Sequence, residues 1–374
     1  MNAQRVLDTF LDLVRIDSPS TKEAGVARYC ADALRACGCE VEFDQGGLDA
    51  GSDTGNIYAV LPGTAPGSVI FTAHMDCVPP CCGVEPIITD GVIHTDASTV
   101  LGGDDKVGDA AIIEAVRSLV EGDEPYCTVK IVLTVQEEVG CCGAKALSAG
   151  DFEPDEPCFV FDMDGNPGGV TVGAPYHYTF GADFIGKASH AGCAPAEGIH
   201  AIAAAAKAVS LMRERGCLGA VGANAASNVG KISGGSANNI IPDACHITGE
   251  CRAVDKALCE SNKAAMMQCL EDGAAAEGAR VEQHWELEYD GFLLTEEDSA
   301  VQLAKKSAEA CGLPFWMEVS AGGSDANIFK GRGVAPCVVA TGMTNFHSVT
   351  ECLKVKDLED TARMAIALAR IAAK

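Results

Sequence analysis

The feature of this chain that most limits its fold is a set of short apolar runs that alternate with helix-like stretches and end in polar clusters. The runs typical of strands are residues 56–63, 68–74, 128–135 and 157–162. Apolar residues recur at helical spacing in residues 2–16, 22–37 and 109–122. Because strands that alternate with helices pair in parallel, the pattern predicts an α/β fold on a mainly parallel sheet.

The pattern changes at about residue 178, where YTFGADFIG alternates like a half-exposed strand. Further helices are expected at 199–213, 255–272, 298–311 and 356–373. The first two belong to a smaller α+β unit, after which the first pattern returns. At 374 residues the chain is long enough for two domains. We therefore expect one domain in two parts, residues 1–177 and 291–374, with a second domain inserted at 178–290.

The charge of the chain excludes some classes of partner. Asp and Glu number 53 against 27 Lys and Arg, a formal net charge of -26. Such an acidic chain repels nucleic acid and anionic lipid, so we expect no partner of either kind. The first residues predict an amphipathic helix and not a signal peptide, and no apolar stretch approaches the roughly 20 residues of a membrane span. We expect a cytoplasmic protein.

The chain has 19 cysteines, which we expect to remain thiols that serve as small buried residues. The cluster of Cys77, Cys81 and Cys82 beside His74 admits a structural zinc or iron-sulfur site as an alternative. Adjacent cysteines do not form the C-x-x-C pairs of ordinary zinc knuckles, however, so this alternative is disfavoured.

Polar residues follow apolar runs at five places, which is where open α/β sheets carry their sites. They are His74 with Asp76, Asp104 with Asp105, Glu137 with Glu138, Asp162 with Asp164, and His347. Each cluster alone is ordinary: a structural histidine, a helix cap or a solvated pair of acids. Together they would mass acids in one crevice, where their repulsion requires neutralising cations. Two divalent metals bridged by a carboxylate meet that need, and mixed His and carboxylate ligation favours zinc, with cobalt or manganese as alternatives.

The order of these motifs resembles the M20 metallopeptidases. The motifs are H-x-D, G-x-D-D-K-x-G, E-E-x-G, D-x-D-G and H-S-x-x-E, and the resemblance runs from about residue 8 to the carboxyl terminus. Within that family the segments GGDDKVG, EEVGCCGAK and FDMDGNPGGV are most similar to the peptidase T-like tripeptide aminopeptidases. The resemblance implies a zinc-peptidase catalytic domain and an inserted lid or dimerisation domain.

The resemblance also implies a set of metal ligands. These are His74, His347, Asp104 as the bridge, Glu138 and an Asp of the DMDG segment. Asp162 directly ends the strand and is our choice for that Asp, while Asp164 keeps the glycine after it and stays open. Glu137 would be the general base, and Asp76 would orient His74. On a strand, neighbouring side chains point to opposite faces, so Glu138 would face a metal and Glu137 the water.

The inserted domain carries further candidates by the same resemblance. In KASHAGCAPAEG, His190 would stabilise the oxyanion, in many members of the family from the neighbouring subunit of a dimer. The candidates for contact with substrate are Asn238, Asn239, Arg252, Gly322, Gly323 and Ser324, with Arg252 on the substrate carboxylate. Judged from the residues alone, Arg252 is a surface strand residue and the glycines form turns.

The expected activity is hydrolysis of an amide bond by a metal-activated water. The leading hypothesis is an aminopeptidase that removes the first residue from short peptides such as tripeptides. The alternative is a dipeptidase or N-acyl-amino-acid deacylase of the same fold, since the metal chemistry is shared. A non-hydrolytic metal-binding module is a third hypothesis. A short peptide is the expected partner, with a homodimer formed through the inserted domain.

Overall fold

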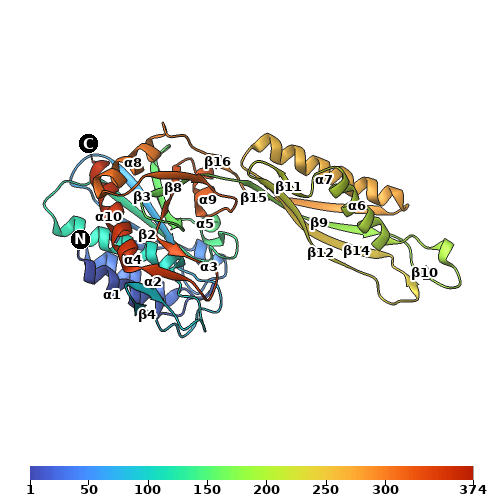
Figure 1. The fold of residues 1–374 in the computed structure, drawn as a ribbon, viewed down its shortest axis with the longest axis horizontal. Coiled ribbons are helices and arrows are strands. Elements are labelled where there is room, and N and C mark those ends of the chain that lie inside the picture. The colour runs from blue at the N-terminus through green and yellow to red at the C-terminus, as the bar shows by residue number, and fades with distance from the viewer. Residues whose placement is uncertain (374) are drawn as a thin grey trace. The chain divides into compact units, whose positions relative to one another are not determined.

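The computed structural model describes residues 1–373, which form two compact units (Figure 1). Unit 1 comprises Met1–Val172, Leu294–Glu318 and the segment from Ser324 onward, and unit 2 comprises Gly173–Leu293 and Val319–Gly323. The division by function at 177/178 and 290/291, with the second domain as a lid or dimerisation domain, stays a prediction.

The main sheet has nine strands, and its centre is parallel. The path is β1 (Glu40–Phe43), β2 (Ile57–Leu61), β6 (Thr128–Thr134), β3 (Ser68–His74), β7 (Pro157–Met163), β18 (Ala335–Ala340), β8 (Gly169–Ala174) and β16 (Phe292–Leu293), with β17 (Trp316–Val319) beside β8. The pairs β6·β3, β3·β7 and β7·β18 are parallel, whereas β1·β2, β2·β6 and β18·β8 are antiparallel. The predicted α/β class is therefore confirmed.

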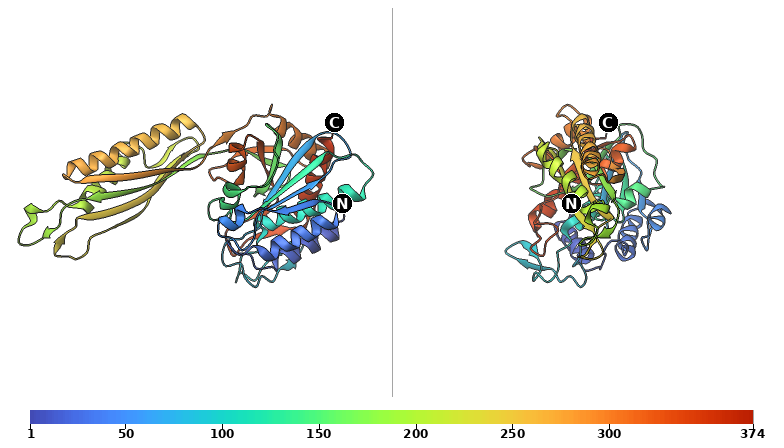
Figure 2. Two further views of the ribbon diagram at one scale, coloured as in Figure 1. Left: turned by 180° about the vertical axis from the view of Figure 1, so that it is seen from behind. Right: turned by 90° about the vertical axis from the view of Figure 1, so that its right-hand side faces the viewer.

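Helices pack against this sheet, as Figure 2 also shows. The long ones are α1 (Ala3–Val14), α2 (Ala24–Ala36), α4 (Gly103–Glu121), α8 (Ser299–Cys311) and α10 (Val355–Ile371). The short ones are α3 (Gly46–Asp49), α5 (Cys142–Ala146) and α9 (Asp325–Gly331). Helix α4 is buried along nearly its whole length, because it packs on β3 and β7 and against α1 and α10. Among residues 1–373 no helix is long and apolar enough to cross a bilayer.

A small antiparallel sheet in unit 1 carries one of the predicted site segments. Its order is β19 (Met343–Thr344), β20 (Cys352–Lys354), β5 (Val92–His94) and β4 (Ile87–Thr89). Residues 345–351, with His347, form the loop between β19 and β20. Because the two strands pair, the loop begins and ends at neighbouring points of the sheet.

Unit 2 is an antiparallel sheet covered by two helices. The strands are β11 (Gly219–Gly222), β12 (Ala225–Gly234), β14 (Ala244–Ala253), β9 (Tyr176–Ile185) and β15 (Arg280–Tyr289), in that order. Helices α6 (Ala201–Glu214) and α7 (Lys256–Ala276) pack on each other and on the sheet around Phe184, Ile247 and Met266. The unit also contains a separate pair, β10 (Ser189–His190) with β13 (Ile240–Ile241), and the 3₁₀ turn η1 (Pro195–Glu197).

The predicted helices and strands of both units are present, but some elements were not predicted. Helix α9 was not predicted, although Ser324 and Asn327 form a capping box at its start. Strands β8 and β15 were also missed. Among residues 1–373 the 19 cysteines form no disulfide bond, and most of them are buried.

Candidate active site

The predicted ligands of unit 1 meet at one edge of the main sheet. Strand β3 ends at His74, which pairs with Thr134 at the end of β6, and β7 ends just after Asp162. Parallel neighbours end at the same edge, so their following residues converge. Helix α4 brings Asp104 to the same place with its first residues, and the loop between β19 and β20 brings His347.

Asp104 lies between the two histidines. Its Oδ1 is 2.9 Å from Nε2 of His74, and its Oδ2 is 3.1 Å from Nε2 of His347. Each histidine also faces a second carboxylate: Oδ1 of Asp162 is 3.8 Å from His74 Nε2, and Oε2 of Glu138 is 2.8 Å from His347 Nε2. The cluster therefore divides into two halves that share Asp104, each with one imidazole and one further carboxylate.

Burial and charge perturb the pKa values of this cluster. Burial raises the pKa of Asp162 well above its usual range, and the neighbouring Asp104 adds to the rise. Burial also favours a raised pKa for Asp104, but hydrogen bonds with His347 and His74 outweigh it and hold that pKa low. Hydrogen bonds to Asp104 and Glu138 raise the pKa of His347 to about 10. The carboxylates of the cluster therefore favour positive charge at the position that they surround.

The donor set fits two divalent cations. Donor atoms of His74, Asp104 and Glu138 lie within 4.8 Å of one another, and so do those of His74, Asp105 and Asp162. Imidazole nitrogen with carboxylate oxygen is the mixture that zinc accepts, and a carboxylate whose two oxygens face opposite histidines suits a bridge. Among residues 1–373, Asp164 belongs to none of the groups of donor atoms that could hold an ion, whereas Asp162 belongs to one.

The two adjacent glutamates do not lie on a strand. Strand β6 ends at Thr134, and Gln136 has a φ of 53°, which turns the chain out of the sheet. Strand alternation was therefore the wrong explanation for how Glu137 and Glu138 come to face different partners. The turn sends Glu138 to His347, while the carboxylate of Glu137 accepts a hydrogen bond from the Cys141 thiol at 3.4 Å.

Glu137 has the perturbed pKa expected of a group that exchanges protons. Burial raises the pKa of its carboxyl to about 8, and the negative charges of Asp325, Glu138 and Asp104 add to this against the opposite effect of His74. A carboxyl poised in this range can take up and release a proton near neutral pH.

Asp76 contacts more than His74. Its Oδ1 is 3.4 Å from His74 Nδ1 and accepts a hydrogen bond from the backbone amide of Glu137 at 2.9 Å. Its Oδ2 accepts from the Ser20 hydroxyl at 2.6 Å and from the amide of Glu138 at 3.3 Å. One fully buried carboxylate thus joins a candidate ligand to the backbone of the two glutamates.

Three buried acids of the site were not assigned a role from the sequence. Glu351 accepts hydrogen bonds from the amides of Gly102 and Asp104, at 2.8 and 2.9 Å, and so fixes the loop that presents Asp104. Asp105 accepts from the amide of His74 at 3.2 Å. Asp325, at the start of α9, accepts from the Thr134 hydroxyl at the end of β6. Glu351 is the last residue of the H-S-x-x-E motif and Asp105 lies in the G-x-D-D-K-x-G motif, so these motifs could have identified both residues as part of the site.

Unit 2 holds most of the candidates for substrate contact. His190 is exposed, and its Nδ1 accepts hydrogen bonds from the amides of Gly192 and Cys193, both at 3.1 Å. In neutral histidine this arrangement leaves the proton on Nε2. Asn238 and Asn239 are exposed in the turn before β13. Arg252, on β14, makes an ion pair with Glu250 at 2.5 Å.

The segment AGGSDAN is divided between the units. Gly322 and Gly323 belong to unit 2, whereas Ser324 begins the part of unit 1 that contains α9. A Cβ on Gly323 would lie 2.3 Å from the Tyr289 ring, so this contact requires glycine. The Ser324 oxygen accepts a hydrogen bond from the Ala326 amide as the cap of α9.

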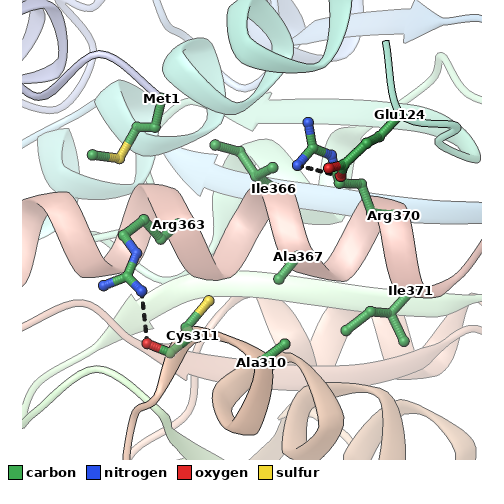
Figure 3. A pocket seen from close by; sticks show the side chains of 9 residues that line it. All are labelled: Met1, Glu124, Ala310, Cys311, Arg363, Ile366, Ala367, Arg370 and Ile371. Carbon is green, nitrogen blue, oxygen red and sulfur yellow. Dashed lines mark hydrogen bonds and ion pairs between the residues drawn. The ribbon is translucent and has the colours of Figure 1, made fainter. Parts of the chain in front are cut away.

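A cavity elsewhere in unit 1 has no part in this cluster. Its volume is about 570 Å³. Figure 3 shows the side chains that line it, mostly from α8 and α10, with two arginines among them. Arg363 donates to the Cys311 carbonyl at 2.7 Å, and Arg370 makes an ion pair with Glu124 at 2.7 Å. Both arginines therefore have partners within the wall, and no candidate ligand lines the cavity.

Comparison with known proteins settles the family. The sequence profile of Peptidase family M20/M25/M40 matches residues 70–371. The chain belongs to this family. The motif-based prediction of an M20 peptidase is confirmed, and with it the hydrolase class.

Full-length relatives of this M20 chain agree with that assignment. A Bacillus subtilis protein described as uncharacterized protein YqjE is 36% identical over 375 residues, covering 100% of both chains. The solved structure of aminopeptidase PepT from Bacillus cereus is 34% identical, covers 100% of both chains and has a TM-score of 0.93. That of a tripeptidase from Staphylococcus aureus is 33% identical, with a TM-score of 0.93 and coverage of 100% of this chain and 99% of the other.

Proposed function

We propose that this M20 peptidase is a two-metal aminopeptidase that removes the first residue from short peptides, tripeptides in particular. The observation that carries the proposal is Asp104, whose two oxygens face His74 and His347 at 2.9 and 3.1 Å. The similarity to PepT of Bacillus cereus and to the tripeptidase of Staphylococcus aureus supports the substrate class.

The proposed metal ligands follow the two halves of the cluster. His74 and Asp162 would hold one ion, His347 and Glu138 the other, and Asp104 both. Zinc is the proposed metal, with cobalt or manganese as substitutes. When bound, two such ions acidify a water molecule and polarise the carbonyl of the scissile bond.

Glu137 is the proposed general base. Its half-buried carboxylate interacts electrostatically with His74, Glu138 and Asp104 of the cluster, so it can take the proton of the attacking water and return it to the leaving amine. The Cys141 thiol donates to its Oε1 at 3.4 Å, which limits the rotation of the carboxylate. Asp76 is the proposed orienting partner of His74, with Oδ1 3.4 Å from Nδ1.

Unit 2 would supply the groups that recognise the peptide. The two amides on Nδ1 of His190 leave its Nε2–H to donate to the oxyanion of the tetrahedral intermediate. Arg252 is the proposed contact for the peptide carboxylate, with Asn238, Asn239 and Gly323 of unit 2 and Ser324 of unit 1 as further contacts. In this proposal unit 2 acts as a lid, and a homodimer forms through it.

A substrate panel tests the proposal. The purified chain is stripped with a chelator, loaded with zinc, cobalt or manganese, and given trialanine, dialanine, N-acetylalanine and N-acetyltrialanine. We expect fastest release of free alanine from trialanine and a loss of that activity when the amine is acetylated. Preferential cleavage of N-acetylalanine or dialanine would replace the aminopeptidase with the deacylase or dipeptidase of the same fold.

The third hypothesis, a metal-binding module without hydrolytic activity, is tested in the same preparation. Two ions per chain together with metal-dependent hydrolysis support the enzyme. Metal that stays bound after the five carboxylate and imidazole ligands are replaced would point to the cysteines instead.

A further inference from the structure

Four consecutive backbone amides at the end of β6 are held by side chains and not by a neighbouring strand. The amide of Val135 donates to Oδ1 of Asn56 at 3.0 Å, and the amide of Gln136 donates to Oε1 of Glu23 at 3.2 Å. The next two amides, of Glu137 and Glu138, donate to the two oxygens of Asp76. We call Asn56, Glu23 and Asp76 the amide clamp.

The members of the amide clamp are rigidly placed. All three are fully buried. Glu23 also accepts from the Thr21 amide at 2.7 Å and from the Ser52 hydroxyl, so both of its oxygens are in use. Asn56 donates from Nδ2 to the Gly143 carbonyl at 3.0 Å and to Asp44 at 3.1 Å.

The amide clamp holds the turn that sets the directions of the Glu137 and Glu138 side chains. Residues 135–138 lie beyond β6, and the φ of 53° at Gln136 is one that non-glycine residues rarely adopt. The Gln136 side chain is held as well, because its Nε2 donates to the Ala50 carbonyl at 3.1 Å. The direction of the next two side chains, Glu137 and Glu138, follows from this one turn.

We propose that Glu23 is a positioning residue for residues 135–138, which we call the catalytic turn. It fixes the backbone at Gln136 and so places the Glu137 carboxylate against the candidate metal cluster. The role of Glu137 rests on the proposed function, whereas the structural role of Glu23 does not. Glu23 has no hydrogen bond with any candidate ligand, so its effect passes through the backbone that it holds. Its direct contact with the turn is the Gln136 amide, and it also holds the Thr21 amide next to Ser20, which donates to Asp76.

Three substitutions separate position from charge. Glu23→Ala removes the acceptor of the Gln136 amide. Glu23→Gln keeps an oxygen at Oε1, and the Ser52 hydroxyl can accept from the new amide group in place of donating. Glu23→Asp keeps the charge but withdraws the oxygens by about 1.5 Å, one bond length.

Hydrolysis of trialanine gives the first readout. Misplacement of a reacting group by about 1 Å can cost about 100-fold, so we expect kcat to fall about 10- to 100-fold in Glu23→Ala and Glu23→Asp. KM should stay within about twofold, because substrate binding is not the step affected. Glu23→Gln should restore most of the activity, although it lacks the charge.

Glu114→Ala is the matched control. Glu114 is also fully buried and also joins separate segments, since it accepts from the Asn2 amide at 2.8 Å, Arg5 Nε at 2.7 Å and the Ser118 hydroxyl at 2.8 Å. It lies outside the amide clamp. We expect this variant to lose thermal stability as the Glu23→Ala variant does, but to keep the kcat of the wild type.

Hydrogen exchange of peptides that span residues 134–140 gives a second readout that needs no activity. In the wild type these amides should exchange slowly although they lie in a turn. In Glu23→Ala the exchange of this segment should rise at least about tenfold, while peptides from α10 keep their protection.

The outcomes are distinct. Exchange of residues 135–138 at the rate of an open loop in the wild type overturns the proposal, even if Glu23→Ala does not fold. So does an activity order in which Glu23→Asp exceeds Glu23→Gln, since charge and not reach would then matter. If the wild type hydrolyses no peptide, the proposed function fails, and the exchange measurement alone still decides the role of Glu23.

Discussion

Replacement of Asp76 by asparagine should weaken both the fold and the metal site. The two oxygens of this carboxylate accept from the Glu137 amide at 2.9 Å, the Glu138 amide at 3.3 Å and the Ser20 hydroxyl at 2.6 Å. Asparagine offers one oxygen and one NH₂ group. Whichever way the amide is turned, the NH₂ group faces a backbone N–H, so one of the two backbone amides loses its acceptor.

The magnitude follows from those contacts. A buried donor left without a partner costs about 1–3 kcal/mol, and the bond that remains is no longer made to a charged oxygen, which costs about 1 kcal/mol more. We therefore expect the metal-free variant to lose about 2–4 kcal/mol of stability. His74 also loses the carboxylate 3.4 Å from its Nδ1, and such a loss typically lowers metal affinity about 10- to 100-fold.

Two measurements check this. Urea unfolding in the presence of a chelator gives the stability without metal, and competition with a chromophoric chelator gives the affinity for zinc. Asp109→Asn is the control, because Asp109 is fully buried as well but its oxygens have no hydrogen-bond partner among residues 1–373. It should not reduce metal affinity.

The reasoning fails if Asp76→Asn is as stable as the wild type and binds zinc equally well. In that case the Glu137 and Glu138 amides would be satisfied in another way, and Asp76 would not link the turn to His74. A loss of stability equal in the two variants would show instead that any buried aspartate responds in this manner.

Three further predictions concern single carboxylates. Glu137→Gln should reduce peptide hydrolysis at least about 100-fold and retain both metals; rapid turnover by this variant would remove Glu137 as the base. Asp104→Ala should lose metal as well as activity, measured by elemental analysis after dialysis, and a full metal complement would exclude it as the bridge. Burial raises the pKa of Asp109 to about 7 from 3.8, with Lys106 opposing the rise, so wild-type stability from this group is lost as the pH climbs from about 4 to 7. The stability of Asp109→Asn relative to wild type should therefore rise by about 3 kcal/mol between about pH 5 and pH 8, and a pH-independent difference would contradict this.

The sequence predicted the framework of the site because that framework depends on local patterns. Short apolar runs and helical spacing predicted the central strands and long helices, and the parallel topology then required the ends of β3, β6 and β7 to share an edge. The family motifs supplied the five candidate ligands. Their distances could not be predicted, since the loop that holds His347 is built on a small sheet that the sequence did not reveal.

The parts that sequence reasoning missed depend on contacts between distant residues. Glu23 reads as an ordinary residue near the start of a helix and Asn56 as the first residue of a strand, yet their side chains hold amides 113 and 79 residues further along. Nothing in a single sequence marks such a pair. Helix α9 is different, because its capping box of Ser324 and Asn327 is a local feature of the sequence, although no helix was predicted there.

The H-x-D motif has a broader role in this structure than the orientation of one histidine. Because Asp76 follows His74 by two residues, its Oδ1 reaches Nδ1 of that histidine, while the same carboxylate accepts from two successive amides of the catalytic turn. The Asp76 carboxylate thus contacts both the candidate ligand on β3 and the backbone of the two glutamates after β6. Adjacent acids can then serve different partners without strand alternation, since the turn fixes the direction of each one.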